Sequence, residues 1–282
     1  MNAVLSNGIL TATFSAVGAE LIGLEKDGRN VIWEGDPAVW GFHAPVLFPI
    51  CGGLKDDRFL YRGKEYTLQK HGFVRRSEFA IESKSENEIV FLHRSNAETL
   101  KQYPFSYEFR VIYTLDGSSL RVGYSVKNPS DDELYFSVGA HEGYACPEGI
   151  EEYSVLFETP ETLDATQLDG NLLAHTTVNY GRGVTELPLK YDYFAVDALV
   201  FRNIRSRSVT LLHRASGRSI GLDFPGHDTF LLWTKPGAKY ICLEPWCGCP
   251  NYVDGGEKLE ERERILRLAG GARITKTHVI RL

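Results

Sequence analysis

The sequence predicts an all-β fold, a large antiparallel β-sandwich with few short helices. Short runs in which apolar and polar residues alternate recur along the chain, and a period of two is typical of half-buried strands. Turn dipeptides separate these runs, among them Asp27-Gly28, Arg62-Gly63 and Asp116-Gly117. Helical periodicity is scarce. This density of strands and turns favours packed antiparallel sheets over a layered α/β fold.

The clearest predicted element is a long antiparallel hairpin. Every second residue is apolar in Phe105–Tyr113 and again in Leu120–Val126. Asp116-Gly117 supplies the turn between the two runs, and Asn128-Pro129 ends the second run. The pattern predicts a hairpin with one apolar face.

The remaining runs predict further strands of the same sandwich. In chain order they are Leu21–Leu24, Val31–Trp33, Phe59–Tyr61, Tyr66–Leu68, Leu134–Val138, Ser154–Phe157, Ala198–Phe201, Val209–His213, Ser219–Phe224, Thr229–Trp233, Tyr240–Leu243 and Arg273–Arg281. Pro160–Gly183 is expected to be a loop, and Gly256–Arg262 a short helix. Because no low-complexity linker or fixed-period repeat divides the chain, we expect one domain, residues 1–282.

Composition narrows the class of protein. The chain has 282 residues, 43% of them hydrophobic, and a net charge of −6. The negative charge argues against binding to nucleic acid. We expect no membrane span, because no run of 18 apolar residues exists, and no signal peptide, because no basic segment and apolar core follow Met1. These features predict a cytoplasmic protein, either a monomer or a homodimer.

The five cysteines are an odd number and fit reduced thiols in that compartment. Cys247-Gly248-Cys249 places two thiols close together. That spacing is too short for a usual zinc knuckle, and no second pair is present. We therefore expect no metal site at this pair.

Three polar side chains stand beside small residues at predicted strand ends. Glu244 follows the apolar run Tyr240–Leu243, His141 follows Gly139-Ala140, and His71 begins His71-Gly72-Phe73. A carboxylate at the end of a buried strand is costly unless it has a partner or a task. Two imidazoles and one carboxylate form an acid/base set suited to neutral pH. Without a phosphate loop, a dinucleotide fingerprint or a metal motif, proton transfer without a cofactor is the simplest chemistry.

Taken singly, these residues have ordinary structural explanations. A histidine in a glycine-flanked turn is more often structural than catalytic, and a glutamate at a strand end more often forms a salt bridge. The joint placement of all three favours a site. Trp246, two residues after Glu244, offers an apolar face to a sugar ring.

Several short motifs occur in an order and spacing that resemble a known family. They are Asn7-Gly8, Trp40, Ala44-Pro45-Val46-Leu47-Phe48-Pro49, Gly63-Lys64-Glu65-Tyr66, His71-Gly72-Phe73-Val74-Arg75, Val138-Gly139-Ala140-His141, Asp197-Ala198-Leu199-Val200-Phe201 and Leu243-Glu244-Pro245-Trp246. Over nearly its whole length the chain resembles the aldose 1-epimerase (galactose mutarotase-like) family, particularly its LacX-like bacterial branch. Relatives often carry His-Pro where this chain has His141-Glu142-Gly143. The extra carboxylate is expected either to raise the pKa of His141 or to face solvent.

The resemblance implies a galactose mutarotase-like supersandwich and an isomerase, a mutarotase that interconverts the α and β anomers of a hexose without a cofactor. Glu244 matches the general base that takes the proton of the anomeric hydroxyl. His141 matches the general acid that protonates the ring oxygen, and His71 the second histidine, which holds the sugar.

The same resemblance implies residues that bind the sugar. Asp197 falls where the family has a carboxylate that binds sugar hydroxyls. Arg58 is the nearest candidate for the family's loop arginine, with Lys55 as the alternative. Arg75 and Trp246 complete the expected sugar site.

Three alternatives to a mutarotase of free hexoses stay open. A mutarotase of hexose 6-phosphates needs clustered cations, which Arg75, Arg76, Lys55 and Arg58 are able to supply. A sugar-binding or sensing module would keep the fold without turnover. A glycoside hydrolase would pair Asp197 with Glu244 and leave the histidines without a role.

Overall fold

Strands dominate the computed structural model, which describes residues 2–282. A 14-stranded sheet runs in the order β12-β20-β19-β16-β14-β17-β18-β22-β10-β9-β8-β7, with β13 added to β20 and β15 added to β14. A four-stranded sheet β1-β2-β3-β4 and two small pairs, β11-β21 and β5-β6, accompany it. Every pairing between these named strands is antiparallel. The predicted antiparallel all-β class is confirmed.

The strand bounds, in chain order, are β1 (Asn2–Ser6), β2 (Leu10–Ser15), β3 (Leu21–Lys26), β4 (Arg29–Asn30), β5 (Arg58–Tyr61), β6 (Lys64–Thr67), β7 (Ala80–Lys84), β8 (Glu88–Arg94), β9 (Glu108–Asp116), β10 (Ser119–Lys127), β11 (Leu134–Phe136), β12 (Val138–Gly139), β13 (Glu142–Ala145), β14 (Tyr153–Asp169), β15 (Leu172–Pro188), β16 (Leu199–Phe201), β17 (Ser208–His213), β18 (Ser219–Asp223), β19 (Thr229–Trp233), β20 (Tyr240–Cys247), β21 (Leu266–Leu268) and β22 (Arg273–Arg281).

Helices are short. The α-helix within residues 2–282 is α1 (Ala97–Gln102), which Asn96 begins with a capping box to Thr99. Single 3-10 turns cover Lys55–Asp57, Val74–Arg76, Ile150–Glu152, Tyr191–Phe194 and Leu259–Glu261. Between residues 2 and 282, no helix has the length and hydrophobicity needed to cross a membrane.

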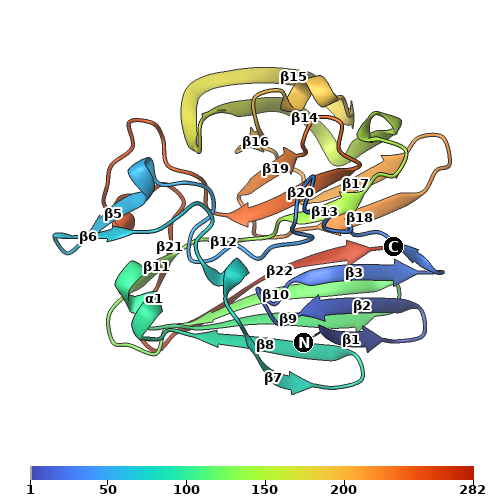
Figure 1. Cartoon of the computed structure of the whole chain (residues 1–282). Coiled ribbons are helices and arrows are strands. Elements are labelled where there is room, and N and C mark those ends of the chain that lie inside the picture. Colours follow the sequence, from blue (N-terminus) through green and yellow to red (C-terminus); the bar gives the residue numbers. More distant parts are fainter. Residues whose placement is uncertain (1) are drawn as a thin grey trace.

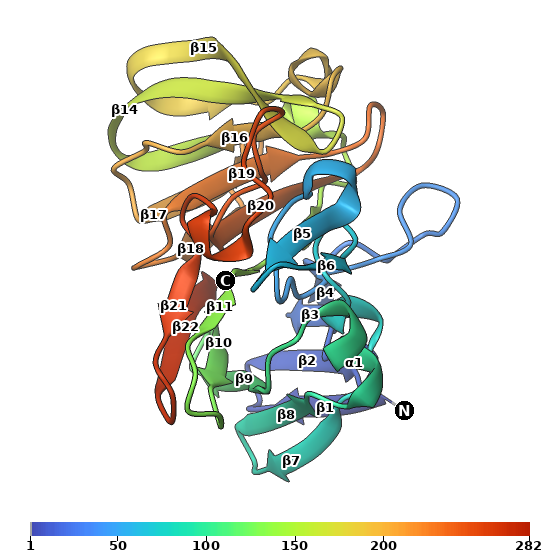
Figure 2. The same cartoon turned by 90° about the vertical axis from the view of Figure 1, so that its left-hand side faces the viewer.

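The four-stranded sheet packs face to face on the part of the large sheet made by β7–β10 (Figures 1 and 2). Phe14 of β2 lies 4.4 Å from Tyr113 and 6.0 Å from Phe91 between ring centroids. The hydroxyl of Tyr113 donates to the carbonyl of Ala19. The β14–β15 hairpin stands at the opposite end of the molecule from β7 (Figure 1).

The long hairpin predicted from alternation is confirmed as β9 and β10, which pair without a register shift from Asp116 and Ser119 to Glu108 and Lys127. The apolar side chains of β10 face the core, since Leu120, Val122 and Val126 are fully buried. The closing strand β22 pairs with β10 along its whole length.

Four local predictions were wrong. Val31–Trp33 is not a strand, since Ile32 alone forms an isolated bridge there, with Tyr144. Pro160–Gly183 belongs to the β14–β15 hairpin, because register shifts between Leu156 and Leu168 let that hairpin continue past residues that usually end strands. Gly256–Arg262 contains one 3-10 turn and no longer helix. β20 does not end at Leu243, because Pro245 stays in the ladder through its carbonyl, which accepts from the amide of Ala140. Glu244 is therefore inside a strand.

Glu142 points into the protein and not toward solvent. It lies opposite Leu243 of β20, and its Oε1 is 2.8 Å from Nε2 of His278 on β22. Glu142 is 3% exposed and His278 is fully buried. Because β13 and β22 belong to distant parts of the large sheet, this contact ties the two across the interior.

We predict that this tie is needed for stability. Glu142→Leu leaves the His278 ring buried without its partner, and breaking a buried pair on one side typically costs about 3–5 kcal/mol. The double variant Glu142→Leu/His278→Phe removes both polar groups and should recover most of that loss. Urea unfolding of the two variants measures the difference. Equal losses in the single and double variants would show that the pair is not coupled.

Candidate active site

A cleft with a volume of about 580 Å³ opens over β19 and β20. Its floor includes Leu231 and Trp233 of β19 and Glu244 and Trp246 of β20. Loops from distant parts of the sequence form its walls, namely residues 37–42, 70–75, 194–198 and 234–236. The size lies in the usual range for small-molecule sites.

Glu244 reaches the cleft because of strand alternation. Leu231 is its partner on β19, and residues directly opposite in an antiparallel ladder share one face. The side chain is 1% exposed, and its Oε2 has no hydrogen-bond partner among the described residues. A carboxyl group that is buried and left unpaired in this way is rare and points to a function.

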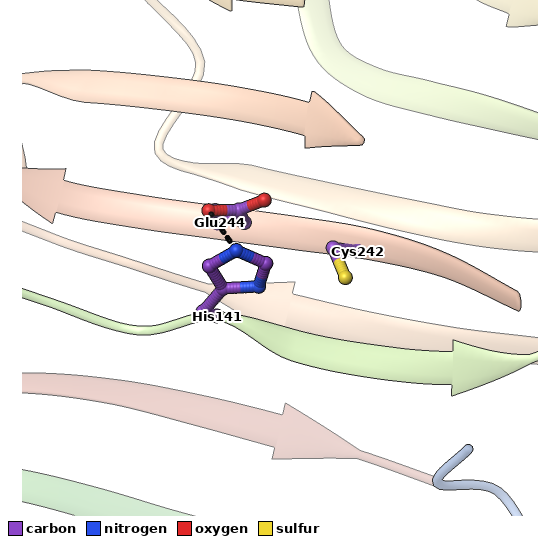
Figure 3. A group of neighbouring side chains, drawn as sticks. All are labelled: His141, Cys242 and Glu244. Carbon is purple, nitrogen blue, oxygen red and sulfur yellow. Dashed lines mark ion pairs between the residues drawn. The ribbon is translucent and has the colours of Figure 1, made fainter. Parts of the chain in front are cut away.

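His141 lies in the short gap between β12 and β13 and faces Glu244 (Figure 3). Its Nε2 is 3.5 Å from Oε2 of Glu244. The preceding residue is fixed twice, because the Ala140 amide donates to the Pro245 carbonyl and the Trp246 indole N–H donates to the Ala140 carbonyl. The strand that carries Glu244 thus also holds His141 in place.

The glycines on either side of His141 allow large rings to approach it. A Cβ at Gly139 would lie 2.4 Å from the Trp246 ring. A Cβ at Gly143 would lie 2.8 Å from Trp40. Trp40 stacks on His141 with ring centroids 5.2 Å apart, so the small residues around the histidine make room for the aromatic walls of the cleft.

His71 enters from a turn with left-handed backbone. His71 and Gly72 both have a φ of 68°, and a Cβ at Gly72 would lie 2.3 Å from the Phe48 carbonyl oxygen. The Gly52 amide donates to Nδ1 of His71, and the His71 amide donates to the Gly52 carbonyl. Since Nδ1 accepts, the neutral ring carries its proton on Nε2. The ring centroid is 5.6 Å from that of His141.

Burial sets the protonation of the three groups. Desolvation raises the pKa of Glu244 well above its usual range, and the nearby carboxylates of Asp197 and Glu142 raise it further against the opposing effect of Lys70. Desolvation lowers the pKa of His141 to about 3. Burial, followed by the proximity of His141, Lys70 and Arg75, lowers the pKa of His71 well below its usual range. Burial therefore favours the neutral form of the carboxyl group and of both imidazoles in the unliganded cleft.

Cations outnumber ionised carboxylates in the cleft. Lys70, Arg75 and Lys235 line it, whereas Asp197 is the one carboxylate there besides Glu244. Lys70 Nζ lies 4.0 Å from Asp197 Oδ2. Arg75 donates through Nη2 to the Lys70 carbonyl, and its Nε is buried without a partner among residues 2–282.

The structure brings most of the expected site residues together. Glu244, His141, His71, Asp197, Arg75 and Trp246 all line the cleft. Arg58 does not. It lies on β5, where its guanidinium pairs with Glu65, Glu257 and Asp56, and Lys55 is likewise absent from the lining. Arg58 lies away from the cleft because exposed carboxylates beside the β5–β6 hairpin pair with it.

Sequence reasoning assigned a role to Trp246 but none to Trp40 or Trp233, which also line the cleft. Trp233 meets His141 edge-on with ring centroids 5.6 Å apart, and Trp40 stacks on the same ring. Trp40 was visible as a motif residue, and Trp233 as the last residue of an alternating run. Lys70 also lines the cleft. Its position directly before His71 in the sequence could have identified it as a site residue.

The arrangement is able to move protons. One carboxyl group and one imidazole lie 3.5 Å apart and line the cleft, and both are groups that can take up or release a proton. Within residues 2–282, one cluster has three side chains close enough to hold a metal ion, and it consists of His141, Cys242 and Glu244. Cys247 and Cys249 do not belong to it.

Comparisons with known proteins agree with this geometry. The family model described as aldose 1-epimerase matches residues 1–267. The plasmid-encoded protein LacX of Lactococcus lactis subsp. lactis is 35% identical over 283 aligned positions, which cover 95% of each chain. A galactose mutarotase related enzyme of Lactobacillus acidophilus has a TM-score of 0.94 at 30% identity, covering 100% of this chain and 97% of that one. A galactose mutarotase-like protein of Lactobacillus casei ATCC 334 has a TM-score of 0.94 at 26% identity, covering 100% and 99%. The expected family resemblance and supersandwich fold are confirmed.

We predict that Gly143 is required for the position of Trp40. Gly143→Ala places a methyl group where the Trp40 ring lies, so the ring must shift, and overpacking of this kind typically costs about 1–3 kcal/mol. Tryptophan emission and urea unfolding should both change. Gly123→Ala is the matched control, since a Cβ there has its nearest neighbour at 3.6 Å. If both variants behave like wild type, the close approach of Trp40 to Gly143 is not a constraint.

Proposed function

This chain belongs to the aldose 1-epimerase family, and on that premise we propose that it is a mutarotase, a cofactor-independent isomerase that interconverts the α and β anomers of a hexose. The observation that carries the proposal is the buried contact of 3.5 Å between His141 and Glu244 in a cleft of sugar size. The reaction needs one group to accept a proton from the anomeric hydroxyl and another to donate one to the ring oxygen.

In the proposed cycle Glu244 is the base and His141 the acid. Glu244 takes the proton of the anomeric hydroxyl while His141 protonates the ring oxygen, and the bond between C1 and that oxygen breaks. The open-chain aldehyde then rotates about C1–C2 and the ring closes on its other face. The reverse proton transfers restore the pair, so no proton is gained or lost over the cycle.

The starting protonation requires a proton transfer between the two groups. Without ligand, burial favours the neutral carboxyl group and the neutral imidazole over the ionised pair. Sugar hydroxyls that donate to the Glu244 carboxylate stabilise its charged form. Transfer of the proton across the 3.5 Å contact to His141 then yields the ionised pair that the reaction uses. Substrate binding thereby prepares both the base and the acid.

The other residues of the cleft hold the ring between these two groups. His71 presents Nε2–H as a donor, since its Nδ1 is occupied by the Gly52 amide. Asp197 is placed to accept from sugar hydroxyls, and Trp246 offers an apolar face beside Glu244. Orientation of this kind is a large part of what a site contributes to a reaction with no cofactor.

A second candidate substrate class is supported by the charges. Arg75 lines the cleft and forms no ion pair within residues 2–282, and Lys235 adds a second cation from the turn after β19. Hexose 6-phosphates, which carry an anion far from the anomeric carbon, would complement this excess. A sugar-binding module is the remaining alternative, and it predicts no catalysed rate with either class.

We predict that Glu244→Gln lowers the catalysed rate of mutarotation by on the order of 10²- to 10⁴-fold and leaves sugar binding nearly intact, because the amide keeps the shape but cannot accept the proton. His141→Asn should do the same by removal of the acid. Polarimetry on fresh α-glucose, α-galactose and glucose 6-phosphate, corrected for spontaneous mutarotation, gives the rates.

The matched control is Glu161→Gln. Glu161 is as buried as Glu244, at 2% and 1% exposed, but lies outside the cleft. Equal catalysed rates in wild type and Glu244→Gln would exclude Glu244 as the base. A wild type without any rate above background would support the binding module instead.

We predict that Arg75 separates the two substrate classes. If the substrate is phosphorylated, Arg75→Gln should reduce kcat/KM for glucose 6-phosphate by at least about tenfold, because a hydrogen bond to a charged group is typically worth about 1.5–3 kcal/mol, and it should affect free glucose much less. Arg76→Gln is the control, since Arg76 is exposed and does not line the cleft. The same loss for both sugars would argue against a phosphate at Arg75.

A further inference from the structure

Cys242 lies beside the proposed acid/base pair but has no part in mutarotation. It is two residues before Glu244 on β20, so both side chains project from the same face of the strand (Figure 3). Cys242 is fully buried and does not line the cleft. Its partners in the ladder are Trp233 on β19 and Gly143 on β13. The thiol therefore lies next to Glu244, in a buried cluster against which Trp40 and Trp233 pack.

Together with His141 and Glu244, this thiol completes a set of three different ligand atoms. One ring nitrogen of His141, Sγ of Cys242 and a carboxylate oxygen of Glu244 all lie within 4.8 Å of one another. In a tetrahedral zinc site, with bonds of about 2.0–2.3 Å, neighbouring ligand atoms are roughly 3.3–3.8 Å apart. The contact between His141 and Glu244 already has that spacing, at 3.5 Å. The other two separations, at most 4.8 Å, exceed that range by about 1 Å at most.

The chemical types of the three ligand atoms indicate which metal ion the trio would bind. Nitrogen, sulfur and carboxylate oxygen are the ligands of zinc, and three protein ligands with an open fourth position are typical of zinc sites that face a cleft. Magnesium and calcium prefer all-oxygen sites and do not match a thiolate. The fourth position here faces the cleft, since His141 and Glu244 line it. The set fits Zn²⁺, and Co²⁺ as its spectroscopic substitute.

The polar atoms of the trio are available. Oε2 of Glu244 is buried without a hydrogen-bond partner among the described residues, and the His141 nitrogen that faces it, 3.5 Å away, is Nε2. His141 is 8% exposed and Glu244 1%. Groups left unpaired in a buried position are those for which a bound ion is a natural explanation. The backbone holds the trio together, because the Ala140 amide donates to the Pro245 carbonyl between the two strands.

We propose that His141, Cys242 and Glu244 form a zinc site, and that occupation of this site by Zn²⁺ switches off mutarotation. The bound ion displaces the protons of the thiol and of the carboxyl group, so two anionic ligands balance its charge. Zn²⁺ then occupies the lone pairs that the reaction needs for proton transfer. Ion binding stands on the cluster alone, whereas its inhibitory effect rests on the proposed function.

The direct test is a titration of the chelator-treated full-length protein with Co²⁺. Wild type should bind one equivalent with a thiolate-to-metal charge-transfer band, and Zn²⁺ should displace it. Cys242→Ser should lose the band and weaken Zn²⁺ binding by at least about tenfold. Cys249→Ser is the matched control, a buried cysteine outside the trio that should keep the band. Cys242→Ala provides the same test if the serine variant does not fold.

The rate of mutarotation in the presence of Zn²⁺ provides the second test. One equivalent of Zn²⁺ should reduce the mutarotation rate of wild type at least tenfold, a chelator should restore it, and Cys242→Ser should keep its rate at the same Zn²⁺ concentration. A band that persists in both Cys242 variants, or no band in wild type, would overturn the zinc site. Zn²⁺ binding without loss of rate would overturn the switch. If metal-free wild type shows no mutarotation, the proposed function fails, and the Co²⁺ spectra still decide the site.

Discussion

The contact between His141 and Glu244 is the constraint on which the rest of the structure depends. The two ionisable groups lie 3.5 Å apart, and both are buried. Oε2 of Glu244, the oxygen that faces His141, has no hydrogen-bond partner among the described residues. Burial disfavours the charged form of each group, which favours the neutral pair over the ionised pair in the unliganded cleft. A pair of this kind has no structural advantage over two apolar side chains of the same volume. Its presence fits the proposed exchange of protons with a sugar.

The fold supplies this contact by strand pairing alone. β20 carries Glu244, and the same strand fixes Ala140 through two hydrogen bonds, so the proposed base and the proposed acid share one scaffold. Behind it, Glu142 and His278 tie the scaffold to β22 across the interior. The cations of Lys70 and Arg75 come from the loop that also carries His71. Glu244 and His141 are thus held by the sheet, whereas the cations come from a loop.

The sequence was sufficient to predict the strands and site residues that depend on a local pattern of residues. Alternation located β9, β10 and β22, and the strand-flanking positions of His71, His141 and Glu244 indicated one site. The sequence did not predict features that depend on contacts between segments far apart in the chain. β20 continues through Pro245 because Ala140 from another strand pairs with it, and Arg58 turns away because carboxylates of β6 and of the 252–258 region attract it. Glu142 pairs with a histidine 136 residues later, and no local pattern predicts that contact. The helix α1 has a capping signal at Asn96, but the helix has only 6 residues, which is too few to show a helical period.

The most direct test of the account is an NMR titration of the imidazole nitrogens in histidine-labelled protein, with the His141 signals assigned by their loss in His141→Asn. The account holds that burial keeps His141 neutral beside Glu244. It therefore predicts that the ring stays neutral as the pH falls from 7 to 4 and gains a proton only near its pKa of about 3. Protonation of His141 near 6.5, the ordinary value for histidine, would show that the pair is not held neutral and would contradict the account.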